Sequence, residues 1–141
     1  CAECRQQTGI KKELNDMLME EIKKAPPSFQ KRLALKLQAM PTGRQGESLS
    51  VFKAVGCKKC GESGYSGRIA LFEVLTMTEN LENIILKQPS ETAINEEAHR
   101  QGMITIFQDG ILKALDGVTT IEEVLHVTGL GDEEGGGRVG K

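Results

Sequence analysis

The chain has no tryptophan, one tyrosine and an aromatic content of only 4% in its 141 residues. It also lacks an excess of basic charge, because 20 Asp and Glu residues outnumber 18 Lys and Arg residues. Nucleic acids are usually bound by basic surfaces, and single strands also by stacking aromatics, so nucleic acid is not an expected partner. No apolar run reaches the ~20 residues that span a bilayer, so direct membrane insertion is not expected either.

Cysteine is scarce too, and the four residues form two Cys-x-x-Cys pairs: Cys1, Cys4, Cys57 and Cys60. Two residues between thiols allow a tight turn to direct both sulfurs at one ion, and two such turns complete a tetrahedral ligand set. Thiolates without a nearby histidine favour zinc. A site closed by four thiolates cannot activate water, so the expected Zn²⁺ is structural rather than catalytic.

Disulfides, redox chemistry and unrelated buried thiols are the alternatives to a metal site. A redox pair needs one Cys-x-x-Cys motif, whereas two motifs with no cysteine left over fit a ligand set better. The 52 residues between Cys4 and Cys57 exceed the usual spacing of zinc sites. This extra loop length costs only about 1 kcal/mol, whereas structural zinc contributes on the order of 10 kcal/mol. The long insert therefore does not exclude zinc.

Apolar spacing predicts a helical hairpin at residues 10–40, inside this insert. Apolar residues recur at helical intervals over 10–24 and again over 29–40, and a Pro-Pro pair separates the two runs. A glycine-containing loop is predicted over 42–48, followed by a β-favouring run over 49–55 that leads into the second cysteine pair.

The strongest strand prediction covers residues 68–75, a run that is apolar on both faces. Such a strand is normally covered on both sides, yet few other strands are predicted to pair with it. The chain also begins directly at a predicted metal ligand, so we expect a fragment of a longer protein whose missing part supplies the neighbouring strands. Arg68 and Glu73 should not pair with each other, because they point to opposite faces of a straight strand. Each is expected to meet a partner in the missing part or in a neighbouring subunit.

Short amphipathic helices are predicted between residues 76 and 129. Thr78 and Ser90 are predicted N-caps, and either Thr119 with Glu122 or Thr120 with Glu123 can begin the last helix. The remaining stretch, residues 130–141, contains five glycines and almost no apolar side chain, so we expect it to be disordered.

These features divide the chain into four parts. Residues 1–60 are predicted to form a zinc-binding subdomain with the hairpin insert at 10–40, and 61–75 a joining loop and strand. Residues 76–129 are predicted to form a helical subdomain, and 130–141 a tail. The predicted fold class is α+β and mostly helical, with one or two strands.

Two stretches resemble the C-terminal end of bacterial type II secretion and type IV pilus assembly ATPases. They are VGCKKCGESGYSGRIALFEVL at 55–75 and HRQGMITIFQDGILKALDGVTTIEEVLHVTG at 99–129, and the resemblance extends over 1–129. It implies a fragment of a RecA-like α/β ATPase domain whose tetracysteine motif binds zinc. It also implies a homo-hexameric motor on the cytoplasmic face of the inner membrane, which contacts platform or adaptor proteins and couples ATP hydrolysis to filament assembly.

The nucleotide-binding motifs of that family do not occur in these 141 residues. ATP and Mg²⁺ are therefore expected in the missing part of the parent protein, and this fragment alone is predicted to be inactive. The insert at 10–40 is longer than the family's usual one and is interpreted as a partner surface. Arg68 and Glu73 are candidates for coupling the nucleotide state to this region, with a structural ion pair as the alternative.

Two other classes of protein stay open at this point. One is a free-standing zinc-ribbon binding module, and the other is a chaperone-type zinc module, because CKKCGESG is close to a CxxCxGxG repeat. The choice between secretion and pilus assembly also stays open.

Overall fold

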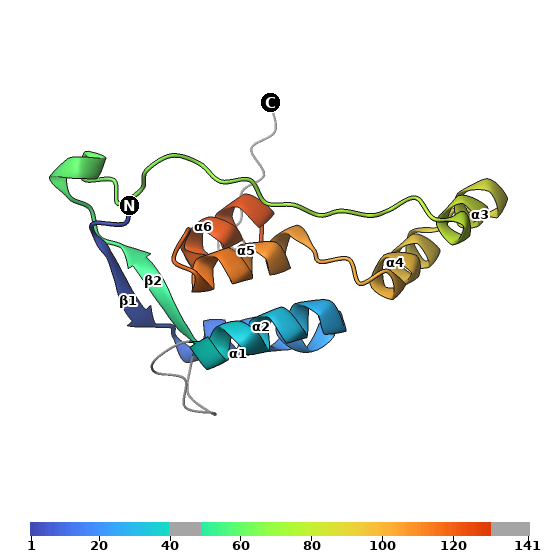
Figure 1. The fold of residues 1–141 in the computed structure, drawn as a ribbon, viewed down its shortest axis with the longest axis horizontal. Coiled ribbons are helices and arrows are strands. Elements are labelled where there is room, and N and C mark those ends of the chain that lie inside the picture. The colour runs from blue at the N-terminus through green and yellow to red at the C-terminus, as the bar shows by residue number, and fades with distance from the viewer. Residues whose placement is uncertain (40–48, 131–141) are drawn as a thin grey trace.

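The computed structural model of the chain describes residues 1–39 and 49–130. In chain order its elements are β1 (Arg5–Gly9), α1 (Lys12–Lys24), α2 (Pro27–Ala39), β2 (Ser50–Ala54), the short 3-10 helix η1 (Lys58–Cys60), α3 (Glu79–Lys87), α4 (Glu91–Arg100), α5 (Ile106–Leu115) and α6 (Ile121–Thr128). The prediction of a mostly helical α+β fold is confirmed (Figure 1). The predicted loop at 42–48 and residues 131–141 of the predicted tail lie outside the described part.

The hydrophobic core lies between the α1–α2 pair and the α5–α6 pair, with β2 at one end (Figure 1). Each of these elements contributes at least one side chain with almost no exposed surface: Leu18, Phe29, Val51, Ile111 and Ile121. The apolar stripes of α1 and α2 therefore pack as the helical spacing predicted. Within the described residues, no helix combines the length and hydrophobicity needed to cross a bilayer.

Strands β1 and β2 form an antiparallel pair in which Arg5 lies opposite Ala54 and Gly9 lies opposite Ser50. Strand β2 falls inside the predicted β-favouring run. Strand β1 was not predicted, because its sequence RQQTG has no apolar alternation and its side chains are largely exposed. The pairing matters for the cysteines, because β1 begins just after Cys4 and β2 ends just before the second cysteine pair.

Side-chain caps begin the last four helices. The predicted caps Thr78, Ser90 and Thr120 are confirmed, since each side chain accepts a hydrogen bond from the backbone N–H of the third residue of its helix. A fourth cap was not predicted. Thr105 accepts from the backbone N–H of Gln108, whose side chain in turn accepts from the backbone N–H of Thr105, so the two residues form a capping box.

The segment at 68–75 is a connection that joins no sheet in the described residues (Figure 1), so the strand predicted there does not form within them. The prediction placed its neighbouring strands in the rest of a longer protein, and that part of it stays a prediction. A strand forms only against a partner, and the described residues offer this segment none. Helix α5 holds it instead. The Asp109 carboxylate accepts from the backbone N–H of Phe72 at 3.0 Å, and the Lys113 ammonium donates to the carbonyl of Ala70 at 2.8 Å.

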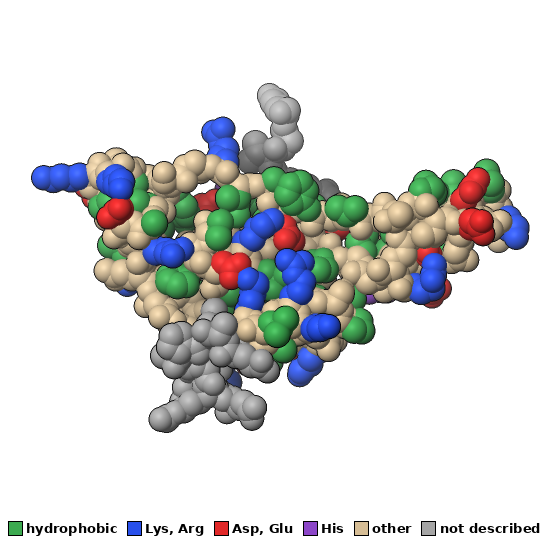
Figure 2. Space-filling model, viewed as in Figure 1, with side chains coloured by type: hydrophobic (Ala, Val, Ile, Leu, Met, Phe, Trp, Pro, Cys, Tyr) green, Lys and Arg blue, Asp and Glu red, His purple; other side chains and the backbone are tan. Residues whose placement is uncertain are grey.

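Apolar side chains of this segment remain exposed. Phe72 is 62% exposed and Val74 is 69% exposed. In Figure 2, hydrophobic side chains lie along the upper edge of the molecule, where Figure 1 shows this connection. The polar contacts with α5 therefore position the segment without burying it.

Helices α3 and α4 pack against each other as an arm that projects from the body (Figure 1). The Glu97 side chain lies at its centre, almost fully buried. Its carboxylate accepts hydrogen bonds from Thr78, Asn80, Arg100 and Gln101. Arg100 and then Gln101 are the strongest causes that hold the pKa of Glu97 well below its usual range, against the effect of burial. The arm is therefore organised around a buried, ionised carboxylate.

Candidate metal centre

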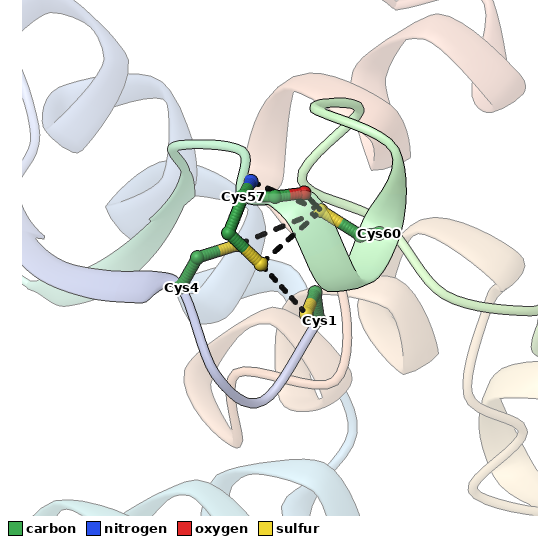
Figure 3. Close-up of side chains that lie close together, drawn as sticks. All are labelled: Cys1, Cys4, Cys57 and Cys60. Carbon is green, nitrogen blue, oxygen red and sulfur yellow. Dashed lines mark hydrogen bonds between the residues drawn. The ribbon is translucent and has the colours of Figure 1, made fainter.

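The two cysteine pairs lie on two tight turns at the same end of the β1–β2 ladder. In the first turn the carbonyl of Cys1 accepts from the backbone N–H of Arg5 at 3.1 Å. In the second turn the carbonyl of Cys57 accepts from the backbone N–H groups of Cys60 at 3.1 Å and Glu62 at 2.9 Å. The ladder thus brings together two turns that are far apart in the sequence, and each turn directs two sulfurs inward (Figure 3).

The four sulfur atoms form a compact cluster. The Sγ atoms of Cys1 and Cys57 are 4.0 Å apart, those of Cys4 and Cys60 are 3.9 Å apart, and those of Cys57 and Cys60 are 3.7 Å apart. All four lie within 4.8 Å of one another. A regular tetrahedron with Zn–S bonds of ~2.3 Å has edges of about 3.8 Å, so the spacing fits a tetrathiolate metal site.

The same distances argue against the disulfide alternative. All four cysteines are free, and the sulfur separations are far above the ~2.05 Å of a disulfide bond. The chain therefore holds four thiols in positions suited to one metal ion. Tetrahedral sets of four thiolates are typical of zinc and of iron–sulfur sites, and the spacing is consistent with zinc.

Backbone N–H groups favour the thiolate form of one ligand. The Sγ of Cys60 accepts from the backbone N–H groups of Cys57 and Gly64, each at 3.2 Å. Burial alone would raise the pKa of Cys60, but these hydrogen bonds, together with those from the thiols of Cys57 and Cys4, outweigh it and lower the pKa to about 7. For Cys4, burial is the largest effect and raises the pKa. Metal binding near neutral pH must therefore displace protons from part of the ligand set.

Gly64 is a positioning residue that lies in the predicted joining loop after the second cysteine pair. Its φ is +80°, and a Cβ at this position would lie 2.6 Å from the Cβ of Ala54 at the end of β2. Glycine is therefore needed both for the backbone conformation and for the close approach to β2. This approach places the backbone N–H of Gly64 against the sulfur of Cys60.

Two basic residues near the cluster, Arg5 and Lys59, have individual partners. Lys59 forms an exposed ion pair with Glu3 at 2.7 Å, which joins the two turns. The Arg5 guanidinium donates to the carbonyls of Asp116 and Gly117, at 3.3 and 2.7 Å, and lies over the Phe52 ring. Arg5 thus links the cysteine end of the sheet to the loop between α5 and α6. No sequence pattern predicted this contact.

The two charged residues of the 68–75 segment differ in their surroundings: Glu73 contacts α5, whereas Arg68 lines a cavity that Cys1 also lines. The expectation that Glu73 needs a partner outside the chain is corrected: its carboxylate accepts from the backbone N–H of Ile106 at 3.1 Å, at the start of α5. This contact suits an anion at a helix N-terminus. Arg68 is exposed and lines a cavity of about 670 Å³.

That cavity lies between the connection and α6. Its apolar lining comes from both sides of the opening: Ile69, Leu71, Ile106, Val118, Val124 and Val127. Glu123 adds a negative charge near the same opening. A partly apolar hollow of this size is a surface to which another part of a protein can pack.

The fold and the cysteine cluster together define a small, mostly helical unit with a candidate tetrathiolate metal site. The sequence model of the family described as Type II/IV secretion system protein matches residues 1–126. The chain therefore belongs to that family.

Individual relatives agree with the family. The type IV pilus assembly ATPase PilB of Thermus thermophilus is 45% identical over 78 residues, which are 55% of this chain and 9% of that protein. The type II secretion system protein E of Aeromonas hydrophila is 36% identical over 103 residues, which are 73% of this chain and 19% of that protein. The chain thus spans less than a fifth of the length of these two relatives.

Proposed function

We propose that this chain is the zinc-binding C-terminal region of a hexameric motor ATPase that powers assembly of a type II secretion pseudopilus or a type IV pilus. The observation that carries the proposal is the family match over residues 1–126, which includes all four cysteines of the tetrahedral cluster. Relatives named for pilus assembly and for type II secretion both match the chain, so the proposal covers both machines.

The proposed role of zinc is structural. Four thiolates leave no open coordination position for water or substrate. Bound zinc would fix the two turns to each other, and through Cys4 and Cys57 it would hold the open end of the β1–β2 ladder. The chain's own groups support this arrangement, because the N–H groups of Cys57 and Gly64 already direct partial positive charge at Cys60.

The remaining parts of the motor are proposed to lie in the rest of the parent protein. Because these 141 residues carry no nucleotide-binding motif, ATP and Mg²⁺ would bind there, and the chain alone would not hydrolyse ATP. The exposed segment 68–75 and the cavity beside it would pack against that ATPase domain, where the segment could join a sheet. The motor would lie on the cytoplasmic face of the inner membrane and would bind platform or adaptor proteins.

Arg68 and Glu73 have separable proposed roles in this arrangement. Glu73 would keep the segment attached to the start of α5, while Arg68 would contact the ATPase domain and help couple its nucleotide state to this region. Steady-state ATP hydrolysis and filament assembly by the full-length Arg68→Ala variant test the coupling. Unchanged rates of both would leave Arg68 with a structural role only.

The metal site is tested by elemental analysis of the purified chain, combined with circular dichroism before and after a strong chelator. We expect one zinc per chain, loss of metal in Cys57→Ser, and full retention in Lys58→Ala, which changes an exposed residue of the same turn. A chain that is folded but free of metal would remove the zinc proposal.

The motor is tested separately, by reading the gene upstream of the Cys1 codon. We expect the same reading frame to encode a phosphate-binding loop. A frame without nucleotide-binding motifs would refute the motor and would favour a free-standing zinc-ribbon or chaperone-type module, while the metal site would stand.

A further inference from the structure

We infer that two copies of this chain associate, and that the outer face of α2 on one copy binds the outer face of α3 on the other. The basic face is defined as Lys31, Arg32 and Leu35 on α2. The acidic face is defined as Glu79, Glu82 and Leu86 on α3. The inference does not rest on the proposed motor, because it uses only charges and exposed side chains of the chain itself.

The basic face lies on a helix of 13 residues without a single acidic side chain, PSFQKRLALKLQA. Phe29 and Leu33 of this helix are buried in the core, whereas Leu35 is 60% exposed. Lys31 and Arg32 lie four and three residues before Leu35, so all three side chains share the outer surface of the helix. The result is an exposed leucine beside two positive charges.

The acidic face has the same design with the opposite charge. On the inner side of α3 the Leu81 side chain is buried, whereas on the outer side the Leu86 side chain is 74% exposed. Glu79, Glu82 and Leu86 follow at i, i+3 and i+7, which places them together on the outer side. The position of both glutamates in the first turn suits the helix dipole, but that does not account for the exposed leucine beside them.

None of these four charges has an ion-pair partner within the described residues, although five other pairs form there. Placing one face on the other would bring leucine against leucine and surround that contact with opposite charges. Such charges mainly set the orientation and the rate of encounter, so the contact should be weak and sensitive to salt.

The two faces lie on different parts of one molecule. In Figure 1, α3 is at the outer end of the arm and α2 belongs to the body. Figure 2 likewise shows acidic and apolar side chains at the α3 end and basic side chains over the α1–α2 layer. The contact must therefore join two copies head to tail, an arrangement that produces either a closed ring or an open chain.

Sedimentation velocity of the purified chain over a range of concentrations is the first measurement. We expect association in 0.01 M salt, where the screening length is about 30 Å, and its loss in 1 M salt, where that length is about 3 Å. A chain that stays monomeric at every concentration in low salt would overturn the inference, as would association that is indifferent to salt.

Complementary charge reversal then identifies the surfaces. One variant combines Lys31→Glu with Arg32→Glu, and the other combines Glu79→Lys with Glu82→Lys. Each variant alone should be monomeric, because both of its faces then carry the same sign of charge. An equimolar mixture should associate again, because every contact between the two variants pairs opposite charges.

The matched control for the Lys31→Glu and Arg32→Glu variant is Lys11→Glu with Lys12→Glu, which makes the same change in net charge at exposed positions at the start of α1. This control should associate like the unmodified chain. The inference is wrong if either face variant associates normally by itself, or if the mixture stays monomeric while circular dichroism shows both variants folded. The zinc proposal would be untouched by either result.

Discussion

Helix α5 packs closely against Val124 of α6 at Gly110, and Gly110→Ala should destabilise the chain for that reason. A Cβ at this position would lie 2.4 Å from Cγ1 and 2.9 Å from Cγ2 of Val124. Carbon atoms in favourable contact are ~3.5–4.0 Å apart, so the new methyl group would overlap both methyls of the valine. Val124 is only 2% exposed, and a helical valine has essentially one side-chain rotamer, so it cannot turn away.

Two effects of opposite sign decide how much Gly110→Ala changes the free energy of unfolding. Alanine in a helix interior is more favourable than glycine by about 1 kcal/mol. Overpacking a core costs about 1–3 kcal/mol, and the overlap with two methyls places this substitution at the upper end. The expected net result is a fall in the free energy of unfolding of about 1–2 kcal/mol. Reversible urea denaturation, followed by circular dichroism with zinc in excess, measures it.

A second substitution separates the steric cause from others. Val124→Ala alone should cost about 2 kcal/mol for the lost methyls and the cavity. Combined with Gly110→Ala it should cost clearly less than the sum, because the new methyl occupies the space that the valine vacates. The control Asn95→Ala, at an exposed position of α4, should raise stability by about 0.5 kcal/mol through helix propensity alone. A stabilising Gly110→Ala, or strictly additive effects, would refute the close packing.

Three further predictions concern the metal site, the arm and a cap. Zinc affinity, measured by competition with a chelator, should fall from pH 8 to pH 6. The reason is that two of the cysteines must lose protons to bind zinc: Cys60, whose pKa is about 7, and Cys4, whose pKa is higher. An affinity that does not change with pH would contradict this. Glu97→Gln should speed amide exchange in α3 and α4 near neutral pH, and this effect should begin to shrink only when the pH falls below about 4.3. Because folding lowers the pKa of Glu97, its contribution is fully present above the ordinary Glu value of about 4.3 and is lost progressively as the pH falls from there through the lowered pKa of the folded chain. Thr105→Ala should lower the free energy of unfolding by about 1 kcal/mol in urea denaturation, whereas Thr105→Ser should retain it; equal losses would argue against the capping box.

The helices were predictable because their signals are local. Apolar residues at helical spacing and the caps at Thr78, Ser90 and Thr120 lie within each segment. The cap at Thr105 was equally available, since Thr105 and Gln108 have the spacing of a capping box. The cysteine cluster was predictable for a similar reason, because each pair is a short motif and four thiols can complete one tetrahedron.

The strands show where local signals are insufficient. The 68–75 run has strong strand propensity but remains unpaired in the described residues, whereas RQQTG has little propensity and forms β1. Strand formation depends on an available partner edge, which propensity does not encode. The burial of Glu97 was also not predictable from local signals. Its partners Thr78 and Asn80 are the N-cap and a residue of α3, and nothing in the apolar spacing of α4 indicates that Glu97 is buried.

The cysteine cluster and the helical body are connected by contacts that give a structural metal a wider effect. Arg5 begins β1 directly after Cys4 and donates to the carbonyls of Asp116 and Gly117 in the loop between α5 and α6. Tyr65, just beyond the second turn, forms a 3.0 Å hydrogen bond between its hydroxyl and that of Thr120, the cap of α6. Because α6 and the residues before it form one wall of the 670 Å³ cavity, an ion that fixes the two turns also helps to fix that wall. Under the proposed function, a structural metal at this site would in this way shape the surface that the chain offers to the rest of the parent protein.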